Sequence, residues 1–165
     1  MTGDSPTEGL GPEVWPTFLA DAADIAAEYR EAGWEVVECD PGDVTAVAST
    51  DHDRFGFSVL VADDEYEAIE ELFDRAEFDS VEVFSHAVEG VVFVLAVERD
   101  EEREVAVTVP IFYRRAGSQD LFEVAEDRGE LPIHLRTPSG DRWLTFSHDE
   151  PSLFAGDAES GESGG

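Results

Sequence analysis

The sequence predicts an α+β protein with three helices and an antiparallel-rich sheet of about eight strands. Two observations lead to this fold class. Apolar residues recur at helical spacing in three separate segments, and short alternating or fully apolar runs typical of strands fill the chain between them. These runs come in groups of three, three and two, and each group follows a helix. Strands that are grouped in this way, rather than alternating singly with helices, indicate the α+β class.

The first helix is predicted over residues 12–32. Phe18, Ile25 and other apolar residues recur there at helical spacing, and Gly33 is a natural C-terminal stop. Three strands are predicted after this helix, in the segments WEVVEC, VTAVAS and FGFSVLVA. The first two are joined by DPGD, which is a strong turn sequence.

The second helix is predicted over residues 63–77, where Tyr66, Ile69 and Phe73 lie on one apolar face. Three further strands follow it. The run VVFVLAV at residues 91–97 is apolar throughout, so we expect it in the middle of a sheet and buried on both faces. Its neighbours VEVFSHAV and EVAVTVPIFY alternate between apolar and polar residues, as half-buried strands do.

A third, short helix is predicted in SQDLFEVAED, and a hairpin of LPIHLRT and RWLTFSH ends the predicted domain. If the hairpin turns at Ser139–Gly140 within PSGD, the turn fixes its register. Ile133 then faces Phe146 on the core side. Arg136 faces Trp143 on the opposite side, where a cation over an indole contributes about 0.5–1 kcal/mol when exposed.

The chain divides into three parts. Residues 1–11 are predicted to be a disordered leader, and residues 149–165 a disordered acidic tail. Residues 12–148 form one α+β domain, as expected for a chain of 165 residues. The leader carries two acids and the tail carries five, and neither contains an arginine. A charge of −23, out of a net −30, therefore belongs to the domain.

Forty acidic residues stand against ten basic ones, and all ten basic residues are arginine. An excess of acids without any lysine resembles the cytosolic proteins of haloarchaea that accumulate salt. The arrangement also looks like one of their small uncharacterised families. This resemblance implies a halophilic protein and no particular activity. The alternative is an acidic protein of an ordinary cell. Molar salt shortens the Debye length to ~3 Å, which screens the repulsion among so many like charges.

The sequence favours a cytoplasmic location. Cys39 is the only cysteine, so no internal disulfide forms, and a reducing compartment fits. It is interpreted as a buried, inert thiol rather than a nucleophile, because no basic residue stands beside it. No signal peptide is predicted near Met1. The longest apolar run, residues 91–97, is far too short to span a membrane, so we predict no membrane partner.

The absence of lysine excludes several chemistries. Schiff-base and pyridoxal catalysis, the phosphate-binding P-loop and the protein kinases all require a lysine. No G-x-S-x-G or H-E-x-x-H motif is present, and no dinucleotide fingerprint follows a strand. We therefore predict no cofactor. The charge of −23 on the domain argues against nucleic acid as a partner, because phosphate contacts need basic residues.

Two patterns have some features of metal sites. DHDRFG at residues 51–56 begins like a calcium loop, but Phe55 and Ala62 occupy positions that need oxygen ligands. The histidines show no ligand spacing; they are His52, His86, His134 and His148. A polar turn and hydrogen-bonded histidines are the simpler interpretations, so no metal site is predicted.

One stretch, FYRRAGS at residues 112–118, combines features of an anion site. Arg114 and Arg115 stand together where an apolar run ends, and Ser118 is a candidate N-cap for the next helix. A helix N-terminus and two guanidinium groups would suit a phosphate or carboxylate. The alternative is internal ion pairing, which four acids per arginine favour. If the strand runs through Arg115, the two side chains point to opposite faces and cannot share one anion.

Two functions remain open at this point. We expect a small non-enzymatic binding or regulatory module with a protein partner or a second copy of itself, because no catalytic motif is present and sheet edges are available. The alternative is an enzyme or binder for an anionic small molecule. It would use the loop of Arg114 and Arg115, with His86 or His134 as the acid–base group.

Overall fold

The computed structural model describes residues 14–48, 55–139 and 142–155. Within these ranges the chain forms three α-helices, α1 (Val14–Glu31), α2 (Asp63–Arg75) and α3 (Gln119–Arg128). The eight strands of the same ranges are β1 (Glu35–Glu38), β2 (Asp43–Val47), β3 (Gly56–Leu60), β4 (Ser80–Val88), β5 (Val91–Asp100), β6 (Val105–Arg114), β7 (Leu131–Arg136) and β8 (Trp143–His148). Two 3-10 helices, η1 (Arg115–Gly117) and η2 (Pro151–Phe154), complete these elements.

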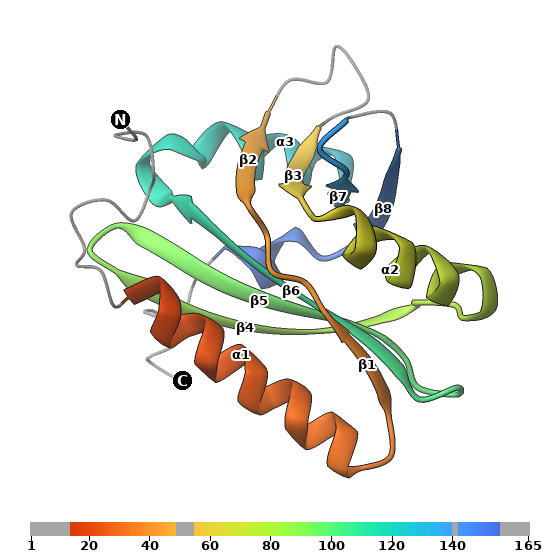
Figure 1. Ribbon diagram of the computed structural model, residues 1–165. Helices are drawn as coiled ribbons and strands as arrows, with labels where there is room; N and C mark the ends of the chain where they lie inside the picture. Colours follow the sequence, from red (N-terminus) through yellow and green to blue (C-terminus); the bar gives the residue numbers. More distant parts are fainter. Residues whose placement is uncertain (1–13, 49–54, 140–141, 156–165) are drawn as a thin grey trace.

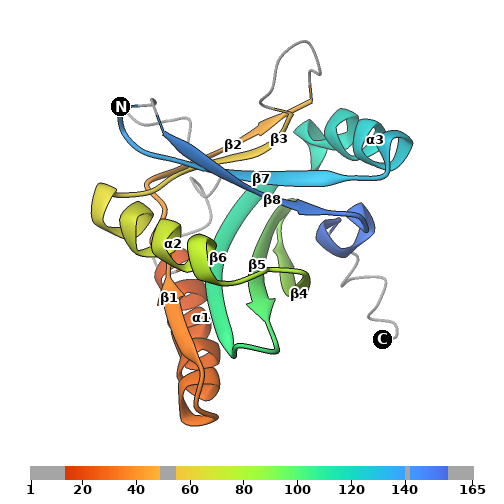
Figure 2. The same cartoon turned by 90° about the vertical axis from the view of Figure 1, so that its right-hand side faces the viewer.

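The strands form two four-stranded sheets, which we name sheet A and sheet B (Figure 1). Sheet A has the strand order β1-β6-β5-β4, and sheet B has the order β2-β3-β7-β8. The α+β class is confirmed, although the predicted strands are divided between two sheets and do not form one. Both sheets are mixed, because β1 runs parallel to β6 and β3 runs parallel to β7. Figure 2 shows the strands of sheet B crossing over those of sheet A.

The main core lies between the two sheets. Val94 and Ile111 on the inner face of sheet A belong to one buried cluster with Phe57 and Ile133 of sheet B. Helix α1 lies on the side of sheet A that faces away from sheet B (Figure 1). There it covers a second cluster that contains Leu95. Strand β5 is therefore buried on both faces, as its continuous apolar sequence predicts.

The helices follow their predicted patterns. The first turn of α2 carries three acids, which the positive end of the helix stabilises. Its apolar face buries Tyr66, Ile69 and Leu72 in the main core. Helix α1 ends just before Gly33, whose φ of +96° favours glycine. None of the helices in the described ranges is both long and apolar enough to cross a membrane.

The predicted register of the last hairpin is confirmed. Strands β7 and β8 pair antiparallel, with Ile133 opposite Phe146 and Arg136 opposite Trp143. Ile133 and Phe146 both belong to the main core, so the predicted core side is also correct. The predicted turn residue Gly140 lies outside the described residues.

The end of the chain differs from the predicted tail. The sequence places residues 149–165 outside the domain, but η2 falls within this range, and Phe154 at its end is fully buried in the main core. The hydroxyl of Tyr113 donates a hydrogen bond of 2.6 Å to the carbonyl oxygen of Phe154. The predicted tail is therefore corrected for η2. The leader, residues 1–11, and residues 156–165 of the tail lie outside the described residues.

Gly56, which belongs to the sequence that begins like a calcium loop, has a structural role of its own. Its φ is +119°, and a Cβ atom at this position would lie 2.2 Å from the carbonyl oxygen of Pro132. Only glycine lets the start of β3 pass so close to β7. Asp51 and Asp53 of the same sequence lie outside the described residues.

Candidate functional site

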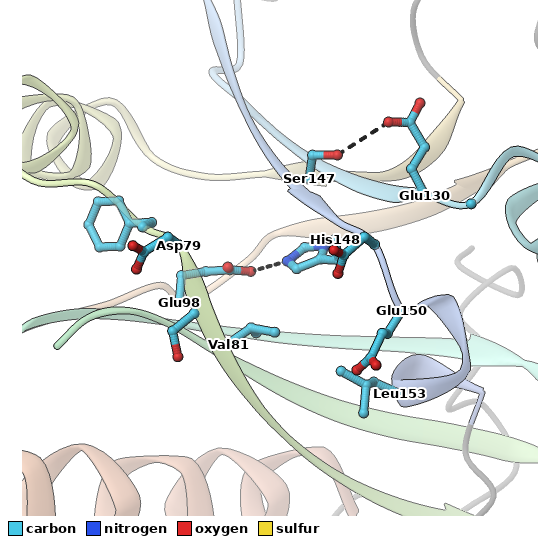
Figure 3. Close-up of a pocket in the computed structure, with 12 residues that line it drawn as sticks. Asp79, Val81, Glu98, Glu130, Ser147, His148, Glu150 and Leu153 are labelled. Atoms are coloured by element: carbon cyan, nitrogen blue, oxygen red, sulfur yellow. Dashed lines mark hydrogen bonds and ion pairs between the residues drawn. The ribbon is translucent and has the colours of Figure 1, made fainter.

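A pocket of about 450 Å³ opens between the two sheets beside η2 (Figure 3). The start of β4, the end of β5 and the end of β8 form its wall, together with residues next to α3 and η2. This volume lies in the range of small-molecule sites. Five carboxylates line the pocket, and they belong to Asp79, Glu98, Glu130, Asp149 and Glu150.

Strand periodicity positions Glu98 and His148 at this pocket. Residues two apart on a strand share a face, so Glu98 continues the inner face that Val94 and Ala96 form on β5. His148 follows Phe146 on the inner face of β8 in the same way. Both side chains are only 3% exposed, and they meet where the ends of β5 and β8 approach each other.

Glu98 and His148 share one proton in their hydrogen bond. Nδ1 of His148 lies 2.7 Å from the carbonyl oxygen of Leu131, which can only accept, so Nδ1 carries a hydrogen. Nε2 of His148 lies 2.6 Å from Oε2 of Glu98. Two unprotonated acceptors cannot form a hydrogen bond, so one proton lies between them. The pair is either an imidazolium with a carboxylate or an imidazole with a carboxylic acid.

The surroundings of the pair raise the pKa of both Glu98 and His148. Burial raises the pKa of Glu98, and the contact with His148 offsets only part of that effect. Burial alone would lower the pKa of His148, but the hydrogen bond and the negative charge of Glu98 raise it overall. Both shifts favour retention of the shared proton, so the pair keeps it to a higher pH than a free histidine would.

The second carboxyl oxygen of Glu98 has a small accessible surface, although the side chain as a whole is 3% exposed. No buried side-chain nitrogen or oxygen in the described part of the chain lacks a hydrogen-bond partner. Oε1 of Glu98 has no such partner among the described residues, so this atom must be accessible. The pocket is the space that Glu98 lines. An otherwise buried side chain thus offers one acceptor to a ligand.

The rest of the wall combines acidic and apolar surface. Ser147 donates a hydrogen bond of 3.4 Å to Glu130, and Arg128 pairs with the same carboxylate at 3.4 Å. No arginine is among the described residues that line the pocket, so its electrostatic field is negative. Apolar surface comes from Phe78, Val81 and Leu153.

The predicted residues Arg114, Arg115 and Ser118 lie elsewhere, where β6 continues through η1 into α3. Strand β6 ends at the exposed Arg114, and the half-buried Arg115 begins η1. Because the strand does not run through Arg115, the two side chains are not forced to opposite faces. Ser118 is buried, and its amide donates a hydrogen bond to the carbonyl oxygen of Arg115. Anion binding by these three residues stays a prediction.

The histidines that were candidates for acid–base chemistry have other surroundings. His134 is buried in sheet B, with Nδ1 lying 2.8 Å from the Thr145 hydroxyl and Nε2 lying 2.8 Å from the carbonyl oxygen of Phe55. Both of its ring nitrogens are therefore engaged. His86 is exposed on β4. Across the described ranges, no group of three or more His, Cys, Asp or Glu side chains could hold a metal ion.

Sequence reasoning did not single out Glu98, and it treated His148 only as one of four histidines. The signal that could have found them is alternation, because each continues the inward-facing positions of its strand. An ionisable residue at such a position needs a partner, since burying an unpaired charge is very costly. The sequence does not show which partner it has, because β5 and β8 belong to different sheets.

Comparison with known proteins identifies one family. Residues 5–155 match the family described as a family of unknown function (DUF7529). No curated protein and no solved structure matches the chain. The matched range includes both Glu98 and His148, together with every residue that lines the pocket.

Proposed function

The chain belongs to the family of unknown function DUF7529, and we propose from the geometry of the pocket that it is a binding module for a small organic cation. The cationic group of the ligand donates a hydrogen bond to Oε1 of Glu98, between sheets A and B. The observation that carries this proposal is the buried Glu98–His148 pair, which lines an acidic pocket and leaves Oε1 of Glu98 without a partner among the described residues.

The charge of the pocket selects a cation. Four carboxylates line it besides the net-neutral Glu98–His148 pair, so an anionic ligand would be repelled. An ammonium or guanidinium group at Oε1 of Glu98 favours the imidazolium–carboxylate form of the pair, because that form places the negative charge next to the ligand. The shared proton moves towards His148 during binding, and no proton has to leave the protein.

The apolar part of the wall favours an organic cation. Phe78, Val81 and Leu153 would contact a short hydrocarbon portion of the ligand. Burying apolar surface contributes about 25 cal/mol for each Å² removed from water. A cation near the ring face of Phe78 would gain about 0.5–1 kcal/mol more. The ligand class is therefore a primary ammonium or a guanidinium that carries a short aliphatic chain.

We expect this binding module to be non-enzymatic, as the sequence also predicts. Both ring nitrogens of His148 are engaged, by Leu131 and by Glu98, so this histidine has no free nitrogen for a substrate. An anionic ligand would instead require Arg114 and Arg115, and these two residues do not line the pocket.

Butylammonium is a suitable probe, with butanol as a neutral control of similar shape. Both are titrated into the full chain at a KCl concentration that keeps it folded, and backbone amides are followed by NMR. The amides of Gly129 and Ser147, which line the pocket, should shift in a saturable way with butylammonium. Butanol should produce no saturable shift at these amides, because it lacks the charge that Glu98 recognises.

Glu98→Gln tests the central contact. The glutamine amide can still donate to Nε2 of a neutral His148, so the local packing is kept while the carboxyl group that accepts from the ligand is removed. Affinity for butylammonium should fall roughly 10- to 100-fold, as expected for one hydrogen bond to a charged group. Glu123→Gln, on the exposed face of α3, makes the same substitution away from the pocket and is the control. Equal affinities of the wild type and Glu98→Gln would contradict the proposal.

A further inference from the structure

Strand β4 forms one edge of sheet A. It pairs with β5 along its whole length, and within the described ranges no strand pairs with its other edge. With nine residues it is the longest edge strand of the two sheets, since β1, β2 and β8 have four, five and six. An unpaired edge of this length is a template for another strand.

β4 carries few of the features that protect edge strands. It contains no proline, and its register with β5 is continuous, without a bulge. Glu82 is its single acidic residue, in a chain that has forty. Phe84, at the centre of the strand, is 37% exposed and is one of two exposed large hydrophobic residues in the described part of the chain.

The face of β4 that carries Phe84 is only partly covered by α1. Glu82, Phe84 and His86 lie on this face, and all three are exposed. A hollow of about 300 Å³ lies between β4 and α1, and its lining includes His86 and Phe18. A second strand that adds to β4 would lie in the plane of sheet A, whereas α1 lies on one face of the sheet.

We propose that β4 pairs antiparallel with β4 of a second copy of the chain, with the two-fold axis at Phe84. In this register Phe84 of one copy faces Phe84 of the other, and Glu82 faces His86 on each side of the axis. An aromatic pair and two acid–histidine pairs are favourable cross-strand neighbours. The two copies of sheet A then form one continuous sheet with an isologous interface.

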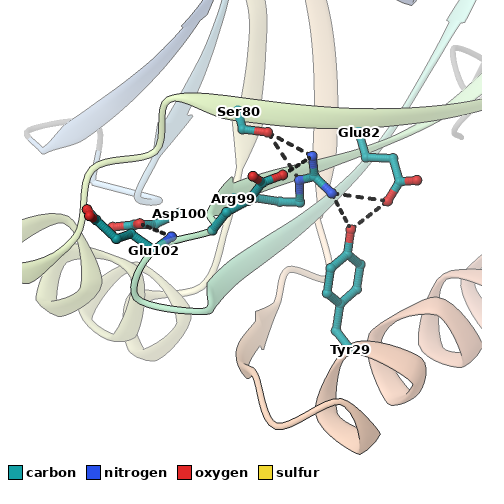
Figure 4. A network of polar contacts seen from close by, with 7 residues as sticks. Tyr29, Ser80, Glu82, Arg99, Asp100 and Glu102 are labelled. Atoms are coloured by element: carbon teal, nitrogen blue, oxygen red, sulfur yellow. Dashed lines mark hydrogen bonds and ion pairs between the residues drawn. The ribbon is translucent and has the colours of Figure 1, made fainter.

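Glu82 is already held in place for this contact. The hydroxyl of Tyr29 on α1 donates a hydrogen bond of 2.5 Å to Oε1 of Glu82, and the guanidinium of Arg99 lies 3.8 Å from the same oxygen (Figure 4). The side chain of Glu82 is still 45% exposed. His86 of the second copy can therefore approach the other carboxyl oxygen while the contact with Tyr29 persists.

The register is selected by charge. A pairing centred on Glu82 would place two carboxylates opposite each other, and one centred on His86 would place two imidazoles opposite each other. The pairing centred on Phe84 avoids both. On the opposite face of the strand, Val83 would meet Ser85, and neither side chain is charged.

Phe84→Cys tests this register by disulfide formation. Facing residues have Cβ atoms about 4.5–5.5 Å apart, close to the separation that a disulfide requires. Oxidation should therefore link two chains. The native Cys39 is buried, as expected from the sequence, and burial raises the pKa of its thiol, so it reacts little.

His86→Cys is the matched control for cross-linking. Position 86 is exposed on the same face of the same strand. In the proposed register, however, it faces Glu82, so the two introduced cysteines would lie about 13 Å apart. Phe84→Cys should form the covalent dimer rapidly, and His86→Cys should form little at the same protein and KCl concentrations. Equal rates for both variants would overturn the proposal.

Light scattering provides the second measurement. At the protein concentration that gives cross-linking, the wild type should have twice the 18.1 kDa mass of the single chain. Phe84→Glu places two carboxylates at the axis and should weaken the dimer about tenfold or more. Circular dichroism checks that this variant keeps its fold. A wild-type mass of one chain at every concentration tested would also overturn the proposal.

Discussion

Nε2 of His148 lies 2.6 Å from Oε2 of Glu98, although the histidine belongs to sheet B and the glutamate to sheet A. The shared proton therefore joins the two sheets. A raised histidine pKa contributes stability that is complete below the ordinary value of 6.5 and is lost as the pH rises through the folded value. The raised pKa of Glu98 acts with the same sign, because the folded state keeps its proton longer than the unfolded chain does.

We expect the melting temperature of the wild type to fall as the pH rises from about 6 to about 9. Glu98→Gln removes the carboxylate that raises the pKa of His148, so the Tm of this variant should fall a few degrees less over the same range. Circular dichroism at fixed KCl measures both curves. Glu123→Gln is the control for the same substitution at an exposed position away from the pair. Parallel curves for the wild type and Glu98→Gln would show that the shared proton does not stabilise the fold.

Asp100 organises the turn between β5 and β6. Its carboxylate accepts hydrogen bonds from the amides of Glu77, Glu102 and Arg103, and it pairs with the Arg103 guanidinium at 2.8 Å. The hydrogen bond from Glu77 and the contacts with Arg103 lower the pKa of Asp100 to about 2, although burial acts in the opposite direction.

Asp100→Asn should lower the Tm by several degrees at pH 7. A depressed carboxyl pKa stabilises the folded protein above the ordinary value of 3.8, and this contribution is lost as the pH falls towards 2. The difference in Tm between the wild type and Asp100→Asn should therefore shrink between these two pH values. Asp120→Asn, at an exposed position in the first turn of α3, is the control. A difference that did not change with pH would indicate lost packing and not a lost charge.

Truncation after His148 should destabilise the domain strongly. It removes Phe154, which is fully buried, and the hydrogen bond that Tyr113 donates to it. Loss of a buried phenylalanine side chain costs about 3–5 kcal/mol. A chain that ends at Ala155 keeps both features and is the control. Urea unfolding at fixed KCl compares the two truncated chains, and equal midpoints would mean that η2 adds no stability.

The net charge of −30 predicts that the stability of the fold rises with ionic strength. The Debye length falls from about 10 Å at 0.1 M salt to about 3 Å at 1 M, so added salt weakens the repulsion among surface acids. The urea midpoint should rise from about 0.1 M to about 3 M KCl. Sucrose at matched osmolality is the control for solvent exclusion. A midpoint that does not depend on KCl would contradict the screening argument.

Local patterns predicted those parts of the fold in which neighbouring segments determine the structure. The register of Ile133 opposite Phe146 follows from one short turn and from alternation within a hairpin. The central place of β5 follows from its own continuous apolar run. Both inferences needed only a short stretch of sequence, and both are confirmed.

Pairings between distant segments could not be predicted in this way. Parallel pairing joins Glu35 to Val105 and Phe57 to Ile133, and no local pattern indicates either partner. The division into two sheets depends on these parallel pairs, so it was missed. The meeting of Glu98 with His148 depends in turn on how the two sheets pack. The candidate site was therefore less predictable than the elements that build it.

The parallel pairing of β3 with β7 has a consequence for the growing chain on the ribosome. Val94 and the rest of β5 are synthesised well before β7 and β8, which cover their inner face. Until β7, β8 and Phe154 have emerged, the inner face of β5 lacks part of the core that covers it. We therefore expect β5 to be open to chaperones at this stage, until β7 and β8 complete sheet B.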